Sequence, residues 1–435
     1  MSERYLIASI NQLEVGRLQE VSGLWSFQYS KAWLKNSASF ALSPHLPLTP
    51  DAQMDGASLR PVQWYFDNLL PEEGQRILLA KDAKIDAADA FGLLAWYGAE
   101  SAGSLVLLPP DAPFQSDEGL RTLPDETLEK RIQELPKAPL THAAIKRMSL
   151  AGAQHKLAVV LRDGEMFEPA GSTPSTHILK PDHPDEDYAH SVVNEWFVMT
   201  LAKRMGLDVP DVHRRYVPSP VYLIDRFDRF VGEQGWQRRH VIDACQLLGL
   251  DKSFKYTQGS MDRLGEIAAA CRSPAVARTN LFRWLVFNVL VGNSDAHLKN
   301  LSFTVSYEGI QLAPFYDLLS VAVYDTPAFD KKSWPQKTEL AWPILNVNHF
   351  ANINRQLLID AAAVLNISKS TAVRLIDNLC NRIESESLLL YTEIQNDNKN
   401  IIQARPEISA TIAGESRCLR TILHLVIKEM VQRLR

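Results

Sequence analysis

The sequence has few of the features that mark disulfide-rich, redox or membrane proteins. Its four cysteines, Cys245, Cys271, Cys380 and Cys418, stand far apart and form no C-x-x-C pair. This argues against a metal knuckle or a redox centre and favours a reduced, cytoplasmic protein. No run of ~18 uncharged apolar residues occurs, so we expect no membrane span. The N-terminal apolar run is too short for a signal peptide, and we expect none.

The composition is otherwise that of an ordinary globular protein. Of the 435 residues, 46% are hydrophobic and 22% are charged, and this length predicts two or three domains. The formal net charge of −5 argues against a nucleic acid bound over the whole surface, although local basic patches are compatible with it. Function therefore has to be sought in local motifs.

Local patterns divide the chain into four stretches. Residues 1–110 mix strands and helices without a reactive cluster, which suggests a docking or scaffolding domain. Residues 111–140 contain a Pro-rich linker and a charged helix. Strands dominate 141–240, and 241–435 is mainly helical, with a helical pattern already from 240 to 291. The expected strands are 5–10, 13–21, 24–29, 104–108, 157–161, 175–180, 212–217 and 220–225, and the expected helices are 61–81 with a break at Pro71, 90–98, 124–135 and 192–205.

The chemically richest stretch follows a nearly all-apolar run. Residues 281–291 are interrupted only by Arg283 and Asn288, which predicts a buried helix, and Gly292 is suited to ending it. The polar residues that follow at once are Asn293, Asp295, His297, Lys299 and Asn300. Polar side chains mounted on a rigid buried support suggest a functional site.

Asp295 and Asn300 have the spacing of a phosphoryl-transfer loop. In an Asp-x-x-x-x-Asn loop the carboxylate acts on the acceptor hydroxyl and the amide holds Mg²⁺. Asp317 follows after residues 301–305 and 309–312, which we expect to form a β-hairpin. Kinases present their catalytic loop and metal-binding Asp in this order. The alternative is a simple turn after a helix.

A second group of residues suits phosphate binding. Residues 151–153 (Ala-Gly-Ala) precede a hairpin with an Asp-Gly turn, and their backbone N–H groups, with Lys156, can approach phosphates closely. Lys180 ends a β-prone run, as the strand lysine of kinases does, and Glu195 on the next helix is placed to pair with it. The alternatives are an ordinary turn into a strand and a solvated glutamate.

Residues 225–230 (Asp-Arg-Phe-Asp-Arg-Phe) follow two expected strands. In a two-lobed kinase the chain would cross between lobes near this point, with backbone groups meeting the adenine. A charged surface loop is the alternative. The C-terminal residues 417–435 are mildly basic, which is typical of a solvated helix face.

Taken together, these motifs resemble the HipA family, the serine/threonine-kinase toxins of bacterial type II toxin–antitoxin systems. The resemblance covers essentially the full length. Its motifs are residues 27–34, 42–48, 65–71 and 101–104 in the N-terminal part, and 149–154, 177–180, 194–195, 226–229, 295–300 and 314–317 in the kinase core. It implies an α/β (α+β) fold of the two-lobed protein-kinase type. The N-terminal α+β subdomain would be 1–110, the linker and helix 111–140, the N-lobe with the phosphate loop 141–240, and an all-helical C-terminal lobe 241–435.

The resemblance also implies a role for each matching residue, with ATP and Mg²⁺ as cofactors. Asp295 matches the catalytic residue, and Asn300 and Asp317 match the Mg²⁺ ligands. Glu195 matches the partner of the strand lysine. The residues that match ATP contacts are Ala151, Gly152, Ala153, Gln154, Lys156, Lys180, Asp225, Arg226, Phe227, His297, Asn300 and Asp317.

Ser149 matches the loop serine that family members phosphorylate on themselves, which removes the loop from the ATP site. One position departs from the family. Many members carry Gln-Glu-Lys where this chain has Gln154, His155 and Lys156, so a neutral or cationic group replaces an anion beside the phosphates.

The function implied is phosphorylation of a Ser or Thr in a translation component, typically an aminoacyl-tRNA synthetase, with growth arrest and persistence as the result. The implied partner is a helix-turn-helix antitoxin of the HipB type, through which operator DNA would mainly be contacted. Two other classes stay open: a binding module that acts as co-repressor with that antitoxin, and a small-molecule kinase, because aminoglycoside kinases share the Asp-to-Asn spacing.

Overall fold

The computed structural model describes residues 3–112, 118–142, 144–148, 150–233 and 235–435. These form two compact units, each assembled from separate stretches of the chain. The first contains residues 1–181, 223–254 and 302–313, and the second contains 182–222, 255–301 and 314–435. Each unit is described by itself.

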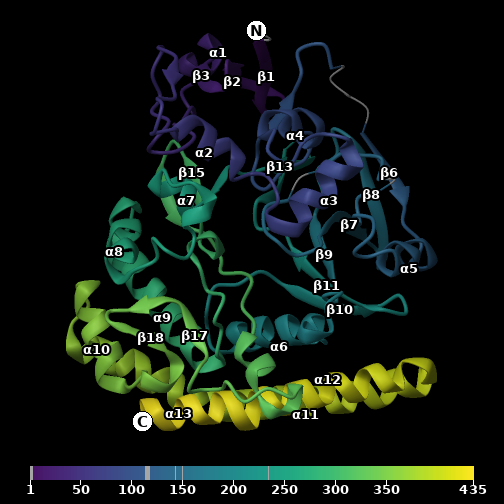
Figure 1. Cartoon of the computed structure of the whole chain (residues 1–435), viewed down its shortest axis with the longest axis vertical. Helices are drawn as coiled ribbons and strands as arrows, with labels where there is room; N and C mark the ends of the chain where they lie inside the picture. Colours follow the sequence, from purple (N-terminus) through teal and green to yellow (C-terminus); the bar gives the residue numbers. More distant parts are fainter. Residues whose placement is uncertain (1–2, 113–117, 143, 149, 234) are drawn as a thin grey trace. The chain divides into compact units, whose positions relative to one another are not determined.

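The first unit begins with a five-stranded sheet in the order β4-β3-β2-β1-β5 (Figure 1). Its strands are β1 (Glu3–Ile10), β2 (Leu13–Val21), β3 (Leu24–Tyr29), β4 (Gln53–Met54) and β5 (Val106–Leu108). Alternate residues of β1, including Leu6, Ala8 and Ile10, are buried, as expected for a strand with one face on a core. The strands expected at 13–21 and 24–29 are thereby confirmed.

Helices cover this sheet through aromatic contacts. The helices of this part are α1 (Lys31–Lys35), α2 (Pro61–Asp67), α3 (Glu73–Ala83) and α4 (Ala90–Tyr97). Phe66 of α2 lies 5.4 Å from Phe27 of β3, and Phe91 of α4 meets Trp25 edge-on at 5.2 Å between ring centroids. The expected break at Pro71 separates α2 from α3, because a Pro cannot continue the preceding helix.

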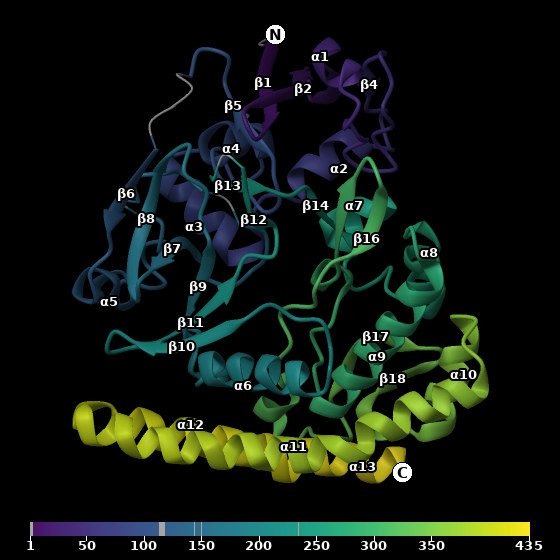
Figure 2. The same ribbon diagram turned by 180° about the vertical axis from the view of Figure 1, so that it is seen from behind.

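A second sheet of the first unit contains neighbouring strands in the order β9-β7-β8-β6, with the Leu223–Asp225 end of β11 beside β9 (Figure 2). The bounds are β6 (Glu118–Thr122), β7 (Leu157–Arg162), β8 (Glu165–Gly171), β9 (His177–Pro181) and β11 (Pro220–Asp225), with helix α5 (Asp125–Gln133) between β6 and β7. The turn between β7 and β8 is the expected Asp-Gly turn: Asp163 and Gly164 both have positive φ, as that turn requires.

Smaller elements complete the first unit. They are β12 (Arg229–Gly232), β13 (Gly235–Arg238), β14 (Val241–Asp243), α7 (Ala244–Leu248), the 3-10 turn η2 (Lys252–Phe254), β15 (Ser302–Ser306) and β16 (Gly309–Leu312). The hairpin predicted for residues 301–312 is confirmed as β15–β16. The helical pattern expected from residue 240 is wrong at its start, because 241–243 pair with β15 as strand β14.

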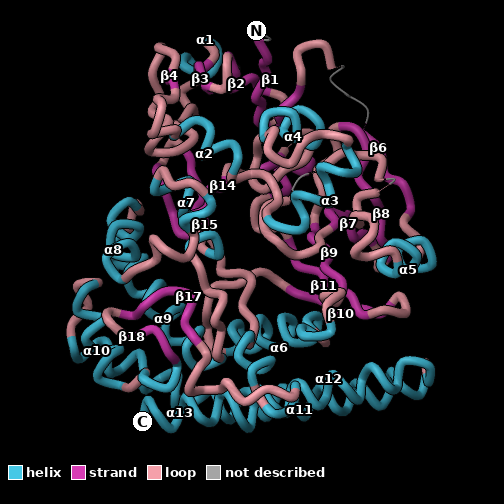
Figure 3. Tube along the Cα trace, viewed as in Figure 1, coloured by secondary structure: helices cyan, strands magenta, loops and turns pink. Residues whose placement is uncertain are grey.

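The second unit is mainly helical (Figure 3). Its helices are α6 (Ser191–Arg204), α8 (Met261–Ala270), α9 (Pro274–Val291), α10 (Arg355–Val364), α11 (Lys369–Ala404), α12 (Ser409–Thr421) and α13 (Lys428–Leu434), with a π-helical segment η8 (Ile422–Ile427) between the last two. Its 3-10 turns are η1 (Glu186–Tyr188), η3 (Leu298–Asn300), η4 (Val321–Asp325), η5 (Pro327–Phe329), η6 (Phe350–Asn352) and η7 (Pro406–Ile408).

Strands also occur in this unit, so the lobe expected to be all-helical is only mainly so. They are β10 (Val212–Tyr216), the start of β11, and the hairpin β17 (Glu339–Ile344) with β18 (Val347–His349). Helix α9 is buried from Leu281 to Val291 apart from Arg283, as the apolar run predicts. All four cysteines are buried. Among the described residues, no helix combines the length and apolarity that a bilayer crossing requires.

Candidate active site

Gly292 sets where the polar stretch leaves helix α9. Its φ of +66° is left-handed, and its N–H donates to Val289 O at 3.2 Å. A Cβ at this position would lie 2.6 Å from Cγ1 of Val426 and 2.8 Å from Cβ of Ala322, so neither the backbone conformation nor the space admits a side chain. The prediction that Gly292 ends the buried helix is confirmed.

Asp295 is held on both sides of its backbone by asparagines. Its N–H donates to Asn293 Oδ1 at 3.1 Å, and its carbonyl accepts from Asn300 Nδ2 at 2.8 Å. Asn293 is itself anchored, because its Nδ2 donates to Oδ1 of the buried Asn288 in α9 at 2.7 Å. Asp295 is half-buried, so its backbone is held in place while the residue stays partly accessible.

Asp317 is tied to the same loop. Asn293 Nδ2 lies 3.4 Å from the Asp317 carbonyl, and Tyr316 Oη donates to the carbonyl of Lys299 at 2.8 Å. Asp317 adopts a left-handed backbone with φ of +52°, which Asp tolerates better than most residues. The structure thus gathers Asp295, Asn300 and Asp317 within the second unit, although they are spread over the sequence.

The donor atoms of this group suit a hard cation. Asn300 uses its amide nitrogen on the Asp295 carbonyl, which leaves the amide oxygen as the donor atom, and Asp317 offers a carboxylate. Oxygen ligands of this kind are what Mg²⁺ takes up alongside phosphate oxygens. His297, which begins the turn η3, and Asn300 are both buried.

The residues predicted to form a phosphate loop lie in the first unit, ahead of β7. Gly152 has φ of +108° and forms an isolated bridge with Pro71, and its carbonyl accepts from Glu72 N at 3.2 Å. Lys156 Nζ donates to the Ala151 carbonyl at 2.8 Å, and a Cβ on Gly152 would lie 2.7 Å from that Nζ. The loop is therefore closed over its own lysine, and the positive φ of Gly152 favours glycine at its centre.

Within the same loop Ala153 is exposed and Gln154 is half-buried. His155, the position that departs from the family, is buried with its Nδ1 2.5 Å from Nε2 of Gln75 in α3. The imidazole is therefore a contact between the loop and helix α3.

Lys180 is placed by strand pairing. Leu157 of β7 pairs with Leu179 of β9, so Lys156 and Lys180 lie at the same end of these antiparallel strands. Lys180 is buried. Glu195 lies in α6 of the second unit and is also buried, which contradicts the alternative that it is a solvated helix residue. Pairing between Lys180 and Glu195 stays a prediction.

The three residues expected to contact the adenine, Asp225, Arg226 and Phe227, differ in burial and in hydrogen bonding. Asp225 Oδ1 lies 3.0 Å from His177 Nε2 of the neighbouring strand β9. Phe227 is half-buried. The Arg226 guanidinium, by contrast, is buried and bonded to Asp228, Glu100, Ser175 and the Ser101 carbonyl, so its side chain is committed inside the unit. Ser149 lies outside the described residues.

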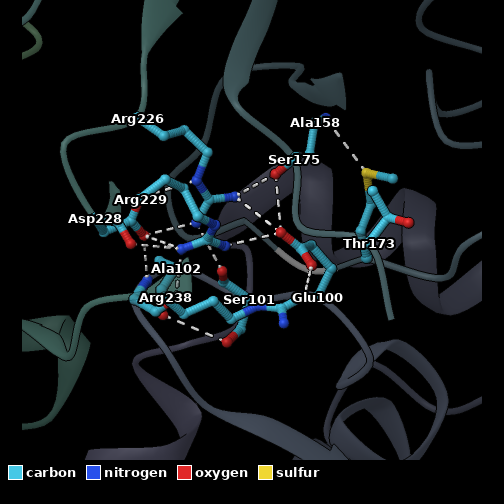
Figure 4. Close-up of polar contacts among 12 residues, drawn as sticks. Glu100, Ser101, Ala102, Ala158, Thr173, Ser175, Arg226, Asp228, Arg229 and Arg238 are labelled. Atoms are coloured by element: carbon cyan, nitrogen blue, oxygen red, sulfur yellow. Dashed lines mark hydrogen bonds and ion pairs between the residues drawn. The ribbon is translucent and has the colours of Figure 1, made fainter. Parts of the chain in front are cut away.

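Arg226 belongs to a buried polar cluster, the Glu100 network, which the sequence did not reveal (Figure 4). Its members are Glu100, Lys146, Ser175, Arg226, Asp228, Arg229 and Arg238. Glu100 Oε1 accepts from Arg229 at 2.8 Å, and Oε2 accepts from Arg238 at 2.7 Å. One signal was available: Glu100 is the single charged residue between positions 90 and 108.

The charges of this network keep Glu100 ionised. Burial alone would raise the pKa of Glu100, but Lys146, Arg238, Arg229 and Arg226 outweigh it and hold the pKa well below its usual value. Burial lowers the pKa of Arg229 to about 10, with the neighbouring Arg226 acting in the same direction. The network therefore joins the segment after α4 to strands β12 and β13 through charges that are almost fully buried.

Family models match most of the chain. The HipA-like C-terminal domain matches residues 148–387, and the HipA N-terminal domain matches residues 6–108. The chain belongs to the HipA family. Its matched HipA segments contain the loop at residues 151–156 and the cluster of Asp295, Asn300 and Asp317.

Named HipA relatives are similar over most of their length. A putative kinase, Y4mE, of Sinorhizobium fredii is 36% identical over 70% of this chain and 74% of its own. The serine/threonine-protein kinase toxin HipA of Shewanella oneidensis is 33% identical over 73% of this chain and 75% of its own. These names identify the chain as a kinase of the HipA family.

A solved structure agrees over nearly the whole chain. It is the Shewanella oneidensis complex of HipA, HipB and operator DNA, which matches with a TM-score of 0.78 and 26% identity over 99% of this chain and 97% of that one. The kinase-like α/β fold expected from the sequence is confirmed.

Proposed function

We propose that this chain transfers the γ-phosphoryl group of ATP to a Ser or Thr hydroxyl of a protein. The observation that carries the proposal is the cluster of Asp295, Asn300 and Asp317, which hydrogen bonds of the Asn293 and Asn300 side chains hold together after the buried helix α9. Family membership supports the same reaction class. A simple turn after a helix would not need to bring the side-chain oxygens of three residues together, of which Asp317 stands 22 positions after Asp295.

In this proposal Asp295 orients the acceptor hydroxyl and receives its proton as the hydroxyl oxygen bonds to the γ-phosphorus and ADP leaves. Asn300 and Asp317 would hold Mg²⁺, which when bound neutralises charge on the phosphates. The remaining proposed ATP contacts are Ala151, Gly152, Ala153, Gln154, Lys156, Lys180, Asp225, Phe227 and His297, with Glu195 as the partner of Lys180. Arg226 would contribute through its backbone carbonyl, since its side chain and its backbone N–H are already hydrogen-bonded within the first unit.

We further propose the regulation and substrates that the family suggests. Ser149 would be phosphorylated by the chain itself, and the protein substrate would be a translation component such as an aminoacyl-tRNA synthetase, with growth arrest in the cytoplasm as the result. The domain limits 1–110, 111–140, 141–240 and 241–435 belong to the same proposal.

A second function is favoured by one observation. The Shewanella relative is seen in a complex with HipB and operator DNA, which supports a role for this chain as co-repressor with a helix-turn-helix antitoxin. This role is compatible with kinase activity.

The kinase proposal is tested with labelled ATP and Mg²⁺ in the presence of cell lysate. We expect label on a protein rather than on a soluble metabolite, and a phosphate on the Ser149 peptide by mass spectrometry. Asp295→Ala and Asp317→Ala should each lose detectable labelling, because the lost base and metal contributions are on the order of 10²–10⁴ in rate. Labelling by either variant at the wild-type rate would refute the assignment, and label confined to a small molecule would favour a metabolite kinase.

A further inference from the structure

The side chain of Asp295 has a partner that the reaction as described above does not use. Tyr256 Oη donates to Asp295 Oδ1 at 2.5 Å. We propose that Tyr256 is a positioning residue for this carboxylate: it occupies one oxygen and fixes the plane of the group, so that the other oxygen faces the acceptor hydroxyl. The inference rests on the proposed function, in which Asp295 receives the acceptor proton.

Tyr256 is itself held against the polar loop. Leu298 N donates to the Lys255 carbonyl at 3.1 Å, which joins the Tyr256 segment to the turn η3. The phenol ring meets the His297 ring edge-on, with 5.0 Å between centroids and 78° between planes. Lys255 Nζ lies 5.2 Å from the centre of the phenol ring. All of these residues belong to the second unit, so the arrangement is internal to it.

The other hydrogen bonds of Asp295 involve only its backbone N–H and carbonyl, so they leave its side chain unrestrained. Asn293 and Asn300 bind the N–H and the carbonyl of Asp295, and neither restrains rotation of the carboxylate about its side-chain bonds. A hydrogen bond to an ionised oxygen is shorter and stronger than one between neutral groups. Because small misplacement of a reacting group lowers the rate strongly, a phenol in this position would act on the rate of transfer rather than on ATP binding.

Tyr256 is also partly open to solvent, with 37% of its surface exposed. The Tyr256 ring packs against His297, and its hydroxyl donates to the Asp295 carboxylate. Substitutions can remove the hydroxyl alone or the hydroxyl and the ring together.

The test uses the full chain and measures the rate of self-labelling from ATP and Mg²⁺. Tyr256→Phe keeps the ring and removes the hydroxyl. We expect the maximal labelling rate to fall about tenfold, as for loss of one hydrogen bond to a charged group, with the KM for ATP changed less than about twofold and the melting temperature unchanged. Tyr307→Phe is the matched control, since Tyr307 is 65% exposed on the β15–β16 turn, and its rate should equal that of the wild type.

Tyr256→Leu removes the ring as well as the hydroxyl, and we expect it to lower the melting temperature in addition to the labelling rate. Comparison with Tyr256→Phe then separates the effect of the hydroxyl on the rate from the effect of the ring on packing. A loss of rate in Tyr256→Phe at unchanged melting temperature supports the inference. A normal rate in Tyr256→Phe, or a loss that appears only with a lower melting temperature, overturns it. A faster rate would also overturn it, because the hydroxyl would then compete with the acceptor. Failure of the kinase proposal is distinguishable, since it would leave Asp295→Ala as active as the wild type.

Discussion

His240 illustrates how much a single buried residue determines in the first unit. Its Nε2 lies 3.0 Å from the Leu42 carbonyl and 3.2 Å from Tyr65 Oη, and its Nδ1 lies 2.9 Å from Ser104 Oγ. Burial lowers the pKa of His240 to about 4. The neutral imidazole therefore connects three segments of the N-terminal part, and a charged one does not fit the same site.

This makes the stability of the chain sensitive to mild acid. An unfolded His takes up a proton near its usual pKa of about 6.5, whereas folded His240 does so only near 4. The free energy of unfolding should therefore decrease as the pH falls from about 7 to 4, by up to about 3 kcal/mol from this group. Urea unfolding at several pH values measures it. His240→Gln should flatten the dependence, while His142→Gln, which changes an exposed His, should not.

Sequence patterns single out residues whose chemistry is distinctive. Asp295 and Asn300 stood out because polar side chains directly follow an apolar run, and Gly292 because a helix must end there. Tyr256 gave no such signal. Its role depends on a contact with Asp295, and nothing in a local stretch of sequence specifies which hydroxyl meets which carboxylate.

At the scale of elements, the Glu100 network joins the β12–β13 hairpin to loop residues from distant parts of the chain. Glu100→Gln would remove the negative charge that four buried cations share. Breaking a buried ion pair in this way costs about 3–5 kcal/mol. We expect a drop of that size in the free energy of unfolding, measured in urea at pH 7. The control is Glu266→Gln on the exposed face of α8, which should change it by less than about 1 kcal/mol. Equal effects would contradict a special role for the network.

Elements with a strong local pattern were predicted closely, and those fixed by distant partners were not. The strand expected at 13–21 is β2, because alternation and flanking turns define it. Strand β14 was missed because its three residues sit within a helical pattern and become a strand only by pairing with β15. The hairpin β17–β18 was not predicted from the sequence for a similar reason, because its strands are short and its register is irregular.

At the scale of the whole molecule, each unit draws on three separate stretches of chain. The domains expected from the sequence are contiguous, because composition and periodicity report on neighbours along the chain. Which distant stretches share a core depends on long-range contacts that local patterns do not contain. The resemblance to a family supplied the fold class that the patterns could not.

The net charge of −5 leads to a prediction about DNA. The chain alone should not shift a duplex from its own upstream region at ~150 mM salt, because DNA affinity depends on the phosphates that a protein neutralises. With the proposed helix-turn-helix partner added, the shift should appear and weaken steeply as salt rises. A mobility-shift assay between ~50 and ~200 mM salt measures both. A steep salt dependence with the chain alone would place the DNA contacts on this protein instead.

The burial of Cys245, Cys271, Cys380 and Cys418 has a practical consequence. Burial raises the pKa of Cys380 to about 11 and that of Cys418 further, so these two thiols are rarely in the reactive thiolate form near neutral pH. Burial also shields Cys245 and Cys271 from reagents in solution. One cysteine introduced at exposed Ala153 would then be the preferred target of a maleimide dye. A fluorophore there would follow the loop around Gly152 in real time, in a chain that keeps its native thiols.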